Sequence, residues 1–360
     1  MAILSDLFSK FSFLPKKFVG IDIGTTSIKV VELRYADGVF HLTGYGILTN
    51  YGHLERINDA IQTRTFKVME ENTAKLLDAL LKHAKIDATN AVMSVPAFSA
   101  FTTTVDFPVM SRREIAQSVP YQARQFVPVP LNEVLIDWQI VEESVGKLVV
   151  LLVAIPNDIV GRYIKIAKLA HLKLSAMELE AISLARCLMS KDPTPSLLVD
   201  IGGRSTTFSI TDKTTVRLTT SIDISGGDLS QVIATGLSID PFRAEEIKKA
   251  YGLKPPPGQE SVAHLMLPLI ETIKSESYRV IENYARRTGV RVSQIVLTGG
   301  SANLPGLLEY WAKDSPYKVI KGDPFELGYI KYMSHLAPII KEIGTSLTVA
   351  CGLAMRNLKI

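Results

Sequence analysis

A short pattern, in which an apolar stretch ends in aspartate and glycine, occurs twice in this chain. The first copy spans residues 22–27 and reads Asp-Ile-Gly-Thr-Thr-Ser, and the second spans residues 200–205 and reads Asp-Ile-Gly-Gly-Arg-Ser. Each copy lies between two apolar stretches, so each predicts a β-hairpin. One copy alone would be an ordinary tight turn, because Asp and Gly are common turn residues. Two copies about half a chain length apart favour a duplicated fold.

The residues of these turns suit a phosphate group and a divalent cation. Glycine lets backbone N–H groups approach an oxyanion, hydroxyl groups add donors, and aspartate holds Mg²⁺ through its waters. A third turn, at residues 299–301, follows an apolar strand at 295–298 and precedes a predicted helix at 304–311. Such a turn can hold adenosine or its α-phosphate against the backbone. The two hairpins, facing one another, would clamp a nucleotide between them.

Composition indicates an ordinary soluble α/β protein, since 47% of the 360 residues are hydrophobic and 21% are charged. The net charge of +4 is too small to imply nucleic acid, and no aromatic-basic platform for single strands is present in the sequence. We expect no segment to span a bilayer. The two cysteines, Cys187 and Cys351, are expected to be reduced core thiols of a cytosolic protein.

The N-terminal segment, residues 1–17, has its own apolar pattern. It predicts either an amphipathic helix for a membrane surface or a partner, or a segment that folds against its own domain. The apolar residues that recur at helical spacing are Ile3, Leu4, Leu7, Phe8 and Phe11.

An insertion follows the first half-repeat. A strand at 101–107 leads to a capping box at 111–114, which starts a helix that Pro120 should kink. We expect strands at 134–142 and 148–155 to return the chain to the main sheet. An insertion this small lacks room for a large core, so it must lean on the first lobe and leave a concave apolar strip at the seam.

The second half shows further helix signals. Gly226 and Gly227 open one helix, and a helix from Pro241 stops at Gly252. A long helical stretch at 261–287 is expected to be interrupted near Pro268.

Together these features are similar to the actin, sugar-kinase and heat-shock-chaperone superfamily, over residues 18–358. Residues 112–115, 125–134 and 137–139, the start FVGIDIGTTSIKVVEL and the end ACGLAMRNL resemble the PilM family of type IV pilus assembly. One departure is Pro120, where a larger, helix-compatible side chain is expected. The resemblance implies an α/β fold of actin-like (ribonuclease H-like) type, duplicated in two lobes, with a small inserted α+β subdomain in the first lobe.

The implied division of the chain has eight segments. They are an N-terminal amphipathic segment (1–17), the first lobe in two parts (18–97 and 148–190), the inserted partner-binding subdomain (98–147), the second lobe in two parts (191–222 and 295–335), its upper subdomain (223–294) and a first-lobe closing helix (336–360). Two small-residue helices should cross beneath the nucleotide, with Cys187 and Cys351 in neighbouring helices. The small residues that would allow this approach are Ala181, Ala185, Ala350, Gly352 and Ala354.

The resemblance also implies roles for individual residues. Asp22 and Asp200 match the carboxylates that hold the waters of Mg²⁺. Glu180 falls where bacterial actins place the carboxylate that aligns an attacking water, although Ala181 replaces the usual proline and an exposed helix residue is the alternative. The residues that match contacts to phosphate, sugar, base or adenosine are Gly24, Thr25, Thr26, Ser27, Lys29, Gly202, Gly203, Arg204, Ser205, Gly226, Gly227, Glu245, Lys248, Gly299, Gly300 and Ser301.

The implied function is that of a cytoplasmic ATP-binding component at the inner face of the cytoplasmic membrane. ATP or ADP with Mg²⁺ would lie between the lobes, with slow hydrolysis at most, and the N-terminal cytoplasmic peptide of PilN would lie in a groove beside the insertion. Pilus motor ATPases and self-association are further interactions that the resemblance raises. The candidates for the groove lining, which could instead only pack the insertion onto the lobe, are Phe126, Val127, Val129 and Leu131.

Two other functions are compatible with the same superfamily. A sugar or acetate-type kinase would need a substrate-binding insertion with a general-base aspartate, and the sequence has no recognisable one. A division filament protein resembling FtsA would be expected to carry a C-terminal membrane helix, whereas this sequence ends two residues after Leu358.

Overall fold

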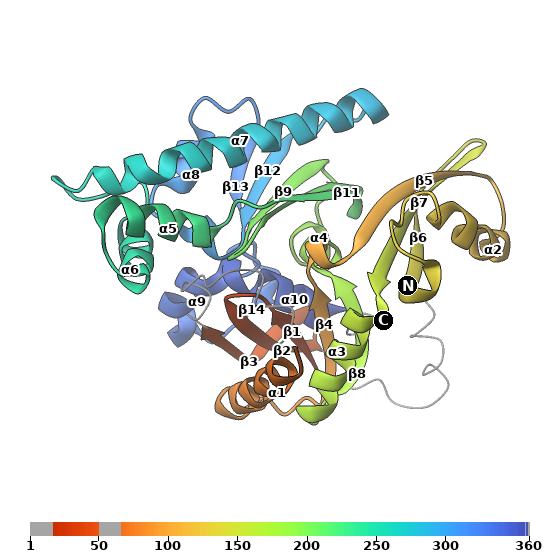
Figure 1. Cartoon of the computed structure of the whole chain (residues 1–360), viewed down its shortest axis with the longest axis horizontal. Helices are drawn as coiled ribbons and strands as arrows, with labels where there is room; N and C mark the ends of the chain where they lie inside the picture. Colours follow the sequence, from red (N-terminus) through yellow and green to blue (C-terminus); the bar gives the residue numbers. More distant parts are fainter. Residues whose placement is uncertain (1–16, 50–65, 357, 359–360) are drawn as a thin grey trace.

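The computed structural model describes residues 17–49, 66–356 and 358. The predicted amphipathic pattern of residues 3–11 lies outside the described residues. Within them the chain forms a six-stranded sheet, a five-stranded sheet and a three-stranded sheet. Figure 1 shows the first two stacked as separate lobes, with the smallest sheet projecting at one side.

The six-stranded sheet is the centre of the first lobe, with the order β14-β3-β2-β1-β4-β8. β1, β2 and β3 form an antiparallel meander, and β4 and β8 continue the sheet parallel to β1. Its central strands read as apolar runs because helices cover both faces: α1 and α3 on one, α4 and α10 on the other. The bounds are β1 Lys17–Ile23, β2 Ser27–Ala36, β3 Val39–Thr49, α1 Phe66–His83, β4 Asn90–Val95, α3 Asn157–Leu169, β8 Lys173–Leu179, α4 Glu180–Met189, β14 Ile330–Lys331, α9 Ala337–Ile343 and α10 Thr348–Met355.

The second lobe repeats this arrangement around a sheet of order β11-β10-β9-β12-β13. β9 and β10 pair antiparallel, and β12 runs parallel to β9, as β4 does to β1. The duplicated actin-like α/β fold is therefore confirmed. α7 lies along the outer side of this lobe (Figure 1). The bounds are β9 Ser196–Ile201, β10 Thr206–Asp212, β11 Thr215–Ile222, α5 Gly226–Leu237, α6 Pro241–Tyr251, α7 Ser261–Thr288, β12 Gln294–Thr298, α8 Leu307–Ala312 and β13 Lys318–Lys321.

α4 and α10 cross with their backbones in close contact. A Cβ atom at Gly352 would lie 2.0 Å from the carbonyl oxygen of Ser183, so only glycine allows this approach. The thiol groups of Cys187 and Cys351 interact across the two helices. The prediction that these cysteines lie in neighbouring helices is confirmed.

The insertion forms its own three-stranded sheet of order β5-β7-β6. The expectation that its last two strands join the main sheet is wrong, because β7 pairs on one side with β5 and on the other with β6. One apolar cluster holds α2 on this sheet, and a second joins the sheet to the first lobe. The bounds are β5 Phe101–Pro108, α2 Arg112–Ala123, β6 Val134–Ser144 and β7 Lys147–Pro156.

Helix boundaries near proline differ from the sequence expectation. The capping box at Ser111 is present, and α2 continues through Pro120. α7 also continues through Pro268, contrary to the expected interruption, because a proline inside a helix costs about 3 kcal/mol, which burial of several apolar side chains offsets. α8 begins at Leu307 and not at residue 304, because Gly306 has a φ of 82°, which a residue inside an α-helix does not adopt.

One described segment, Ser334–Met355, is long and apolar enough to cross a membrane by length and composition, contrary to the expectation that none is. In the structure it consists of α9, α10 and 3₁₀ turns, and every residue of α10 is buried in the protein core.

The 3₁₀ helices are η3 Ala97–Ser99, η4 Leu131–Glu133, η5 Gly300–Asn303, η6 Ser334–Leu336 and η7 Gly344–Leu347.

Candidate functional site

The two predicted hairpins have the same turn. The N–H group of Gly24 donates a hydrogen bond to the carbonyl oxygen of Ser27, and the N–H group of Gly202 donates one to the carbonyl oxygen of Ser205. The N···O distance is 3.0 Å in both. The turns also meet, because a Cβ atom at Gly203 would lie 2.1 Å from Cγ2 of Thr26. The two halves of the fold therefore bring their glycine turns together at one place.

A cavity of about 450 Å³ lies between the lobes at these turns. Its size suits a nucleotide. The structure brings together in its wall all the residues that were assigned above to nucleotide, Mg²⁺ or water. They are Asp22, Gly24, Thr25, Thr26, Ser27, Lys29, Glu180, Asp200, Gly202, Gly203, Arg204, Ser205, Gly226, Gly227, Glu245, Lys248, Gly299, Gly300 and Ser301.

Three carboxylates and one lysine are enclosed at the phosphate end of the cavity. Lys29 Nζ lies 3.1 Å from Asp22 Oδ2, and Ser94 Oγ donates a hydrogen bond to Asp22 Oδ1 at an O···O distance of 2.8 Å. Burial raises the pKa of Glu180 to about 8, and the charges of Asp22 and Asp200 add to the rise. Burial and Asp22 also raise the pKa of Asp200 to about 6, against the attraction of Lys29. One lysine thus does not neutralise this group of acids.

This charge balance fits a divalent cation at the site. A cation would offset both the burial and the mutual repulsion that raise the pKa values of Glu180 and Asp200. Across the described part of the chain, no three His, Cys, Asp or Glu side chains converge as direct metal ligands. Mg²⁺ suits such a site, because it usually keeps several waters and takes further oxygens from a phosphate.

A second charged group lies in the wall of the same cavity. Lys248 Nζ donates hydrogen bonds to the carbonyl oxygen of Gly226, at an N···O distance of 2.7 Å, and to Glu245 Oε2, at 2.6 Å. Although burial disfavours the charged carboxylate, Lys248 and Ser230 hold the pKa of Glu245 down at about 2. Glu245 is therefore a fixed anionic acceptor, suited to hydroxyl and amino groups of a ligand.

Glycine is required where the walls come closest. Gly299 has a φ of 87°, and a Cβ atom there would lie 2.3 Å from Asp200 Oδ1. At Gly226 a Cβ atom would lie 2.3 Å from Ser301 Oγ. Glycine at these two positions therefore lets the turn at Gly299 pack against Asp200 and the start of α5 pack against Ser301, so that the segments around the cavity meet closely.

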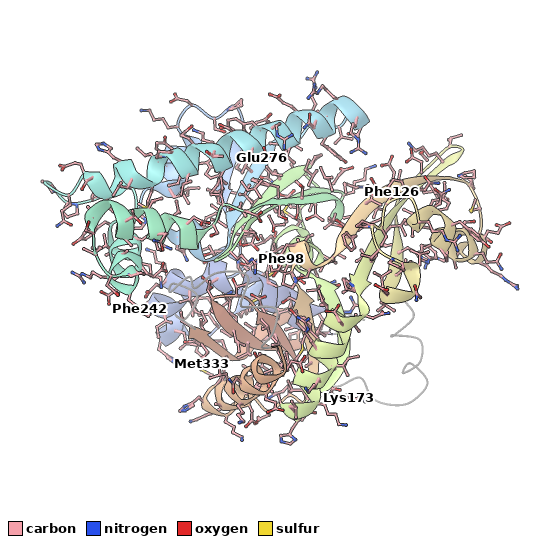
Figure 2. The ribbon with its side chains drawn as sticks, in the orientation of Figure 1. Phe98, Phe126, Lys173, Phe242, Glu276 and Met333 are labelled. Carbon is pink, nitrogen blue, oxygen red and sulfur yellow. The ribbon has the colours of Figure 1, made fainter. Side chains whose placement is uncertain are left out.

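Sequence reasoning missed other residues of the site. Ser94 does not line the cavity but supports Asp22 from within the core; it is fully buried near the end of β4, and a serine among apolar strand residues is the only local signal for it. Phe98 lies between the lobes in Figure 2, with the Arg204 guanidinium 5.1 Å from its ring centre. Thr345 and Ser346 line the cavity from η7, and no sequence motif marks them.

A second hollow, the seam groove, lies where the insertion meets the first lobe. It has a volume of about 120 Å³ and is mostly apolar. β6 and β8, which form its walls, are each at the edge of a sheet. The residues that line it are Leu135, Ile136, Asp137, Trp138, Gln139, Leu151, Val153, Ile155, Val160, Ser175, Ala176, Met177, Glu178, Leu179, Ile182 and Arg356.

The predicted lining residues of the partner groove lie elsewhere. Phe126 and Val127 line a hollow of about 380 Å³ between the insertion and β11 of the second lobe, and Val129 and Leu131 line neither hollow. Phe126 projects from the insertion and is 45% exposed (Figure 2). The difference arises because β6 and β7, and not the segment after α2, form the side of the insertion that faces β8.

Comparisons with known proteins agree with this architecture. The chain is 24% identical over 334 residues to the cell division protein FtsA of Enterococcus faecalis, which covers 81% of this chain and 75% of that protein. It is similar to the solved structure of a PilM-PilN type IV pilus biogenesis complex, with a TM-score of 0.80, 20% identity, and coverage of 95% of this chain and 98% of that chain.

Two further solved structures share the fold. Ethanolamine utilization protein EutJ from Carboxydothermus hydrogenoformans matches with a TM-score of 0.57 and 17% identity, over 95% of this chain and 90% of that chain. MreB5 of Spiroplasma citri bound to ADP matches with a TM-score of 0.50 and 14% identity, over 94% of this chain and 95% of that chain. The family described as type IV pilus assembly protein PilM matches residues 20–358. The chain therefore belongs to the PilM family and is an actin-like component of type IV pilus assembly.

Proposed function

We propose that the chain binds Mg-ATP or Mg-ADP between its lobes and the N-terminal cytoplasmic peptide of a PilN partner in the seam groove. The observation that carries the nucleotide part is the meeting of two identical glycine turns, one from each lobe, in one cavity lined by acids and Lys29. The ADP bound to the MreB5 relative supports the same assignment.

Each part of the cavity has a task in this proposal. Backbone N–H groups of the two turns, together with Lys29, bind the phosphates. Asp22 and Asp200 hold water on the cation, which would neutralise phosphate charge when bound. Glu245 and Lys248 bind the sugar or base, and the turn at Gly299 holds the adenosine side.

Hydrolysis at this site is expected to be slow. Glu180 is the only candidate here for aligning an attacking water, and with a pKa of about 8 it is largely protonated at neutral pH before the cation binds. A protonated carboxyl group cannot accept a proton from water. Any turnover then depends on the bound cation to lower the pKa of Glu180.

The seam groove suits a short extended peptide. Because both walls are edge strands, a peptide can add backbone hydrogen bonds to β6 or β8, while the apolar lining takes aliphatic side chains. Arg356 at the groove is anchored by Glu178, which also pairs with Arg186, so the polar side of the groove is held rigidly. The PilM-PilN complex supports PilN as the partner. Binding to this membrane protein would hold the chain at the inner face of the cytoplasmic membrane.

Calorimetry with Mg-ATP and Mg-ADP tests the nucleotide assignment. Lys29→Met should weaken binding by at least about tenfold, since it removes a buried charge from the phosphate end. Lys75→Met, an exposed lysine on α1, is the matched control and should leave affinity unchanged. Absence of nucleotide binding by the wild-type chain would overturn the assignment.

Fluorescence anisotropy with a labelled PilN N-terminal peptide tests the groove. Leu135→Glu places a charge in the apolar wall and should weaken peptide binding by at least about tenfold. Val145→Glu is the control in the same subdomain, at an exposed hairpin tip outside the groove. Both positions are exposed, so folding should be retained in both variants. Equal peptide affinity in the two variants would move the binding site away from the seam groove.

A further inference from the structure

Two β-bulges face one another across the boundary between the insertion and the second lobe. The pairing of β6 with β7 skips Val141, and the pairing of β11 with β10 skips Arg217. A bulge re-aims a side chain and leaves backbone groups out of the ladder. Here the two irregularities complement each other, because Nη1 of Arg217 donates a hydrogen bond to the carbonyl oxygen of Val141.

Arg217 is unusually enclosed for an arginine, with 7% of its surface exposed. Its Nη2 lies 3.5 Å from Oδ2 of Asp212 in its own hairpin, and its Nη1 lies 3.6 Å from Oε2 of Glu142 in the insertion. Nε has no hydrogen-bond partner among the described residues. The guanidinium group thus joins the second lobe to the insertion through one carbonyl and one carboxylate of β6.

The same strand forms a wall of the seam groove a few residues earlier, at Leu135 to Gln139. The Val141 side chain packs with Leu151, Val153 and Leu179, which also line the groove. Val141 is therefore held by its carbonyl oxygen to the second lobe and by its side chain to the groove walls.

We propose that Arg217 is a positioning residue for the partner groove, which fixes the β6 wall to the second lobe. The opposite wall, β8, is part of the first-lobe sheet. The distance between the walls then depends on how the lobes close around a nucleotide. This inference rests on the proposed function, since it links the two binding sites assigned there.

The consequence is a coupling between nucleotide and peptide. A nucleotide that changes lobe closure changes the peptide affinity by some factor, and the peptide must change the nucleotide affinity by the same factor. Arg217→Lys is the informative variant, because lysine keeps the positive charge between Asp212 and Glu142 but lacks the planar fork of donors. Arg243→Lys, at an exposed arginine of α6, is the matched control.

Amide hydrogen exchange tests the positioning itself, without either ligand. In Arg217→Lys, exchange in residues 134–140 should rise at least about threefold, as expected when a local hydrogen bond is weakened. Exchange in β9 should not change, and Arg243→Lys should match the wild-type chain throughout. Unchanged exchange in residues 134–140 of Arg217→Lys would overturn the positioning role.

Peptide affinity, measured with and without saturating Mg-ATP, tests the coupling. Arg217→Lys should weaken peptide binding about tenfold, because a charge-assisted hydrogen bond is lost. The factor by which Mg-ATP changes the peptide affinity should fall close to one in this variant. Mg-ATP affinity alone should change less than about threefold, because Arg217 does not line the cavity. A residue with a merely structural role would leave the nucleotide effect intact, and that result would overturn the coupling.

The wild-type chain is measured first, so that two failures stay distinct. If it binds no peptide, or no nucleotide, the proposed function is wrong, while the exchange experiment still decides whether Arg217 holds β6. If it binds both and Arg217→Lys changes neither exchange nor coupling, only this inference is wrong.

Discussion

The two hairpins share a backbone but differ in charge. In the first hairpin, formed by β1 and β2, Asp22 faces Lys29. At the equivalent position of the second hairpin, formed by β9 and β10, Asp200 faces Thr207. Asp22 is paired with Lys29 and Ser94, whereas Asp200 relies on the Lys29 of the other lobe, and its pKa is raised to about 6. Duplication has therefore kept the geometry of the glycine turn in both lobes, while charge compensation of the aspartate is present in one.

This difference has a functional meaning. The aspartate of the first hairpin has its charged and hydrogen-bonding partners without a ligand, whereas that of the second would gain a close partner from a cation in the cavity. A bound cation would then matter more to the second lobe than to the first. Equivalent substitutions in the two hairpins should accordingly have opposite effects on the ligand-free protein.

The largest difference is expected in stability at pH 7 without nucleotide. Asp22→Ala should lower the free energy of unfolding by about 3 kcal/mol, because it leaves Lys29 without its buried partner. Asp200→Ala should raise that free energy by about 1 kcal/mol, because it removes a buried carboxylate that costs energy to ionise. Urea unfolding followed by circular dichroism measures both. Destabilisation of equal size in the two variants would mean that the hairpins are electrostatically equivalent.

With ligand present the two variants should converge. Each removes a carboxylate that would hold water on the cation, so each should weaken Mg-nucleotide binding by at least about tenfold, or about 1.4 kcal/mol. Calorimetry with and without Mg²⁺ measures this, and Asp223→Ala is a control at an acidic residue that does not line the cavity. If both variants fold and retain full affinity, the cavity does not bind Mg-nucleotide through these aspartates.

A smaller effect is expected in the dependence of stability on pH. The folded pKa values of Asp200, about 6, and Glu180, about 8, lie above those of the unfolded chain, so the native state binds protons more tightly. Their contribution is fully present below pH 4 and is lost as the pH rises through 6 and then 8. Without nucleotide, the wild-type chain should lose stability across this range.

Glu180→Gln isolates one part of that pH profile. It should remove the loss that Glu180 causes between about pH 4.5 and 8, and leave only the loss between about pH 4 and 6, which belongs to Asp200. Urea titrations at pH 5, 7 and 9 on both proteins provide the comparison. Parallel profiles for the two proteins would show that Glu180 does not titrate as its surroundings require.

The phosphate turns were accessible to sequence reasoning because their chemistry is local. A strand, an aspartate and a glycine turn are contiguous, and the duplication itself predicts that they meet. Phe98 and Thr345 are brought to the cavity, and Ser94 to Asp22, only by the tertiary fold. Their neighbours in sequence carry no sign of a ligand, so no local pattern could have assigned them.

The lining of the hollow between the insertion and the first lobe could not be predicted for a related reason. Which sheet a strand joins depends on pairing with distant segments, and an apolar stretch such as β7 is compatible with either sheet. Once β7 pairs with β5 and β6, the groove is lined by the strands that face β8. Pro268 shows the same limit for helices, since burial along α7 outweighs the local preference to break.

The contact of α10 with β1 has a consequence for synthesis of the chain. A Cβ atom at Gly20 would lie 1.9 Å from the carbonyl oxygen of Ala350, so the first strand and one of the last helices are packed backbone to backbone. The second lobe, by contrast, takes its whole sheet from residues 196–321. As the chain leaves the ribosome from its N-terminus, the second lobe can complete its core first. The first lobe must wait, with one face of its sheet covered by α4 alone, until residues 348–355 emerge and α10 can complete that face.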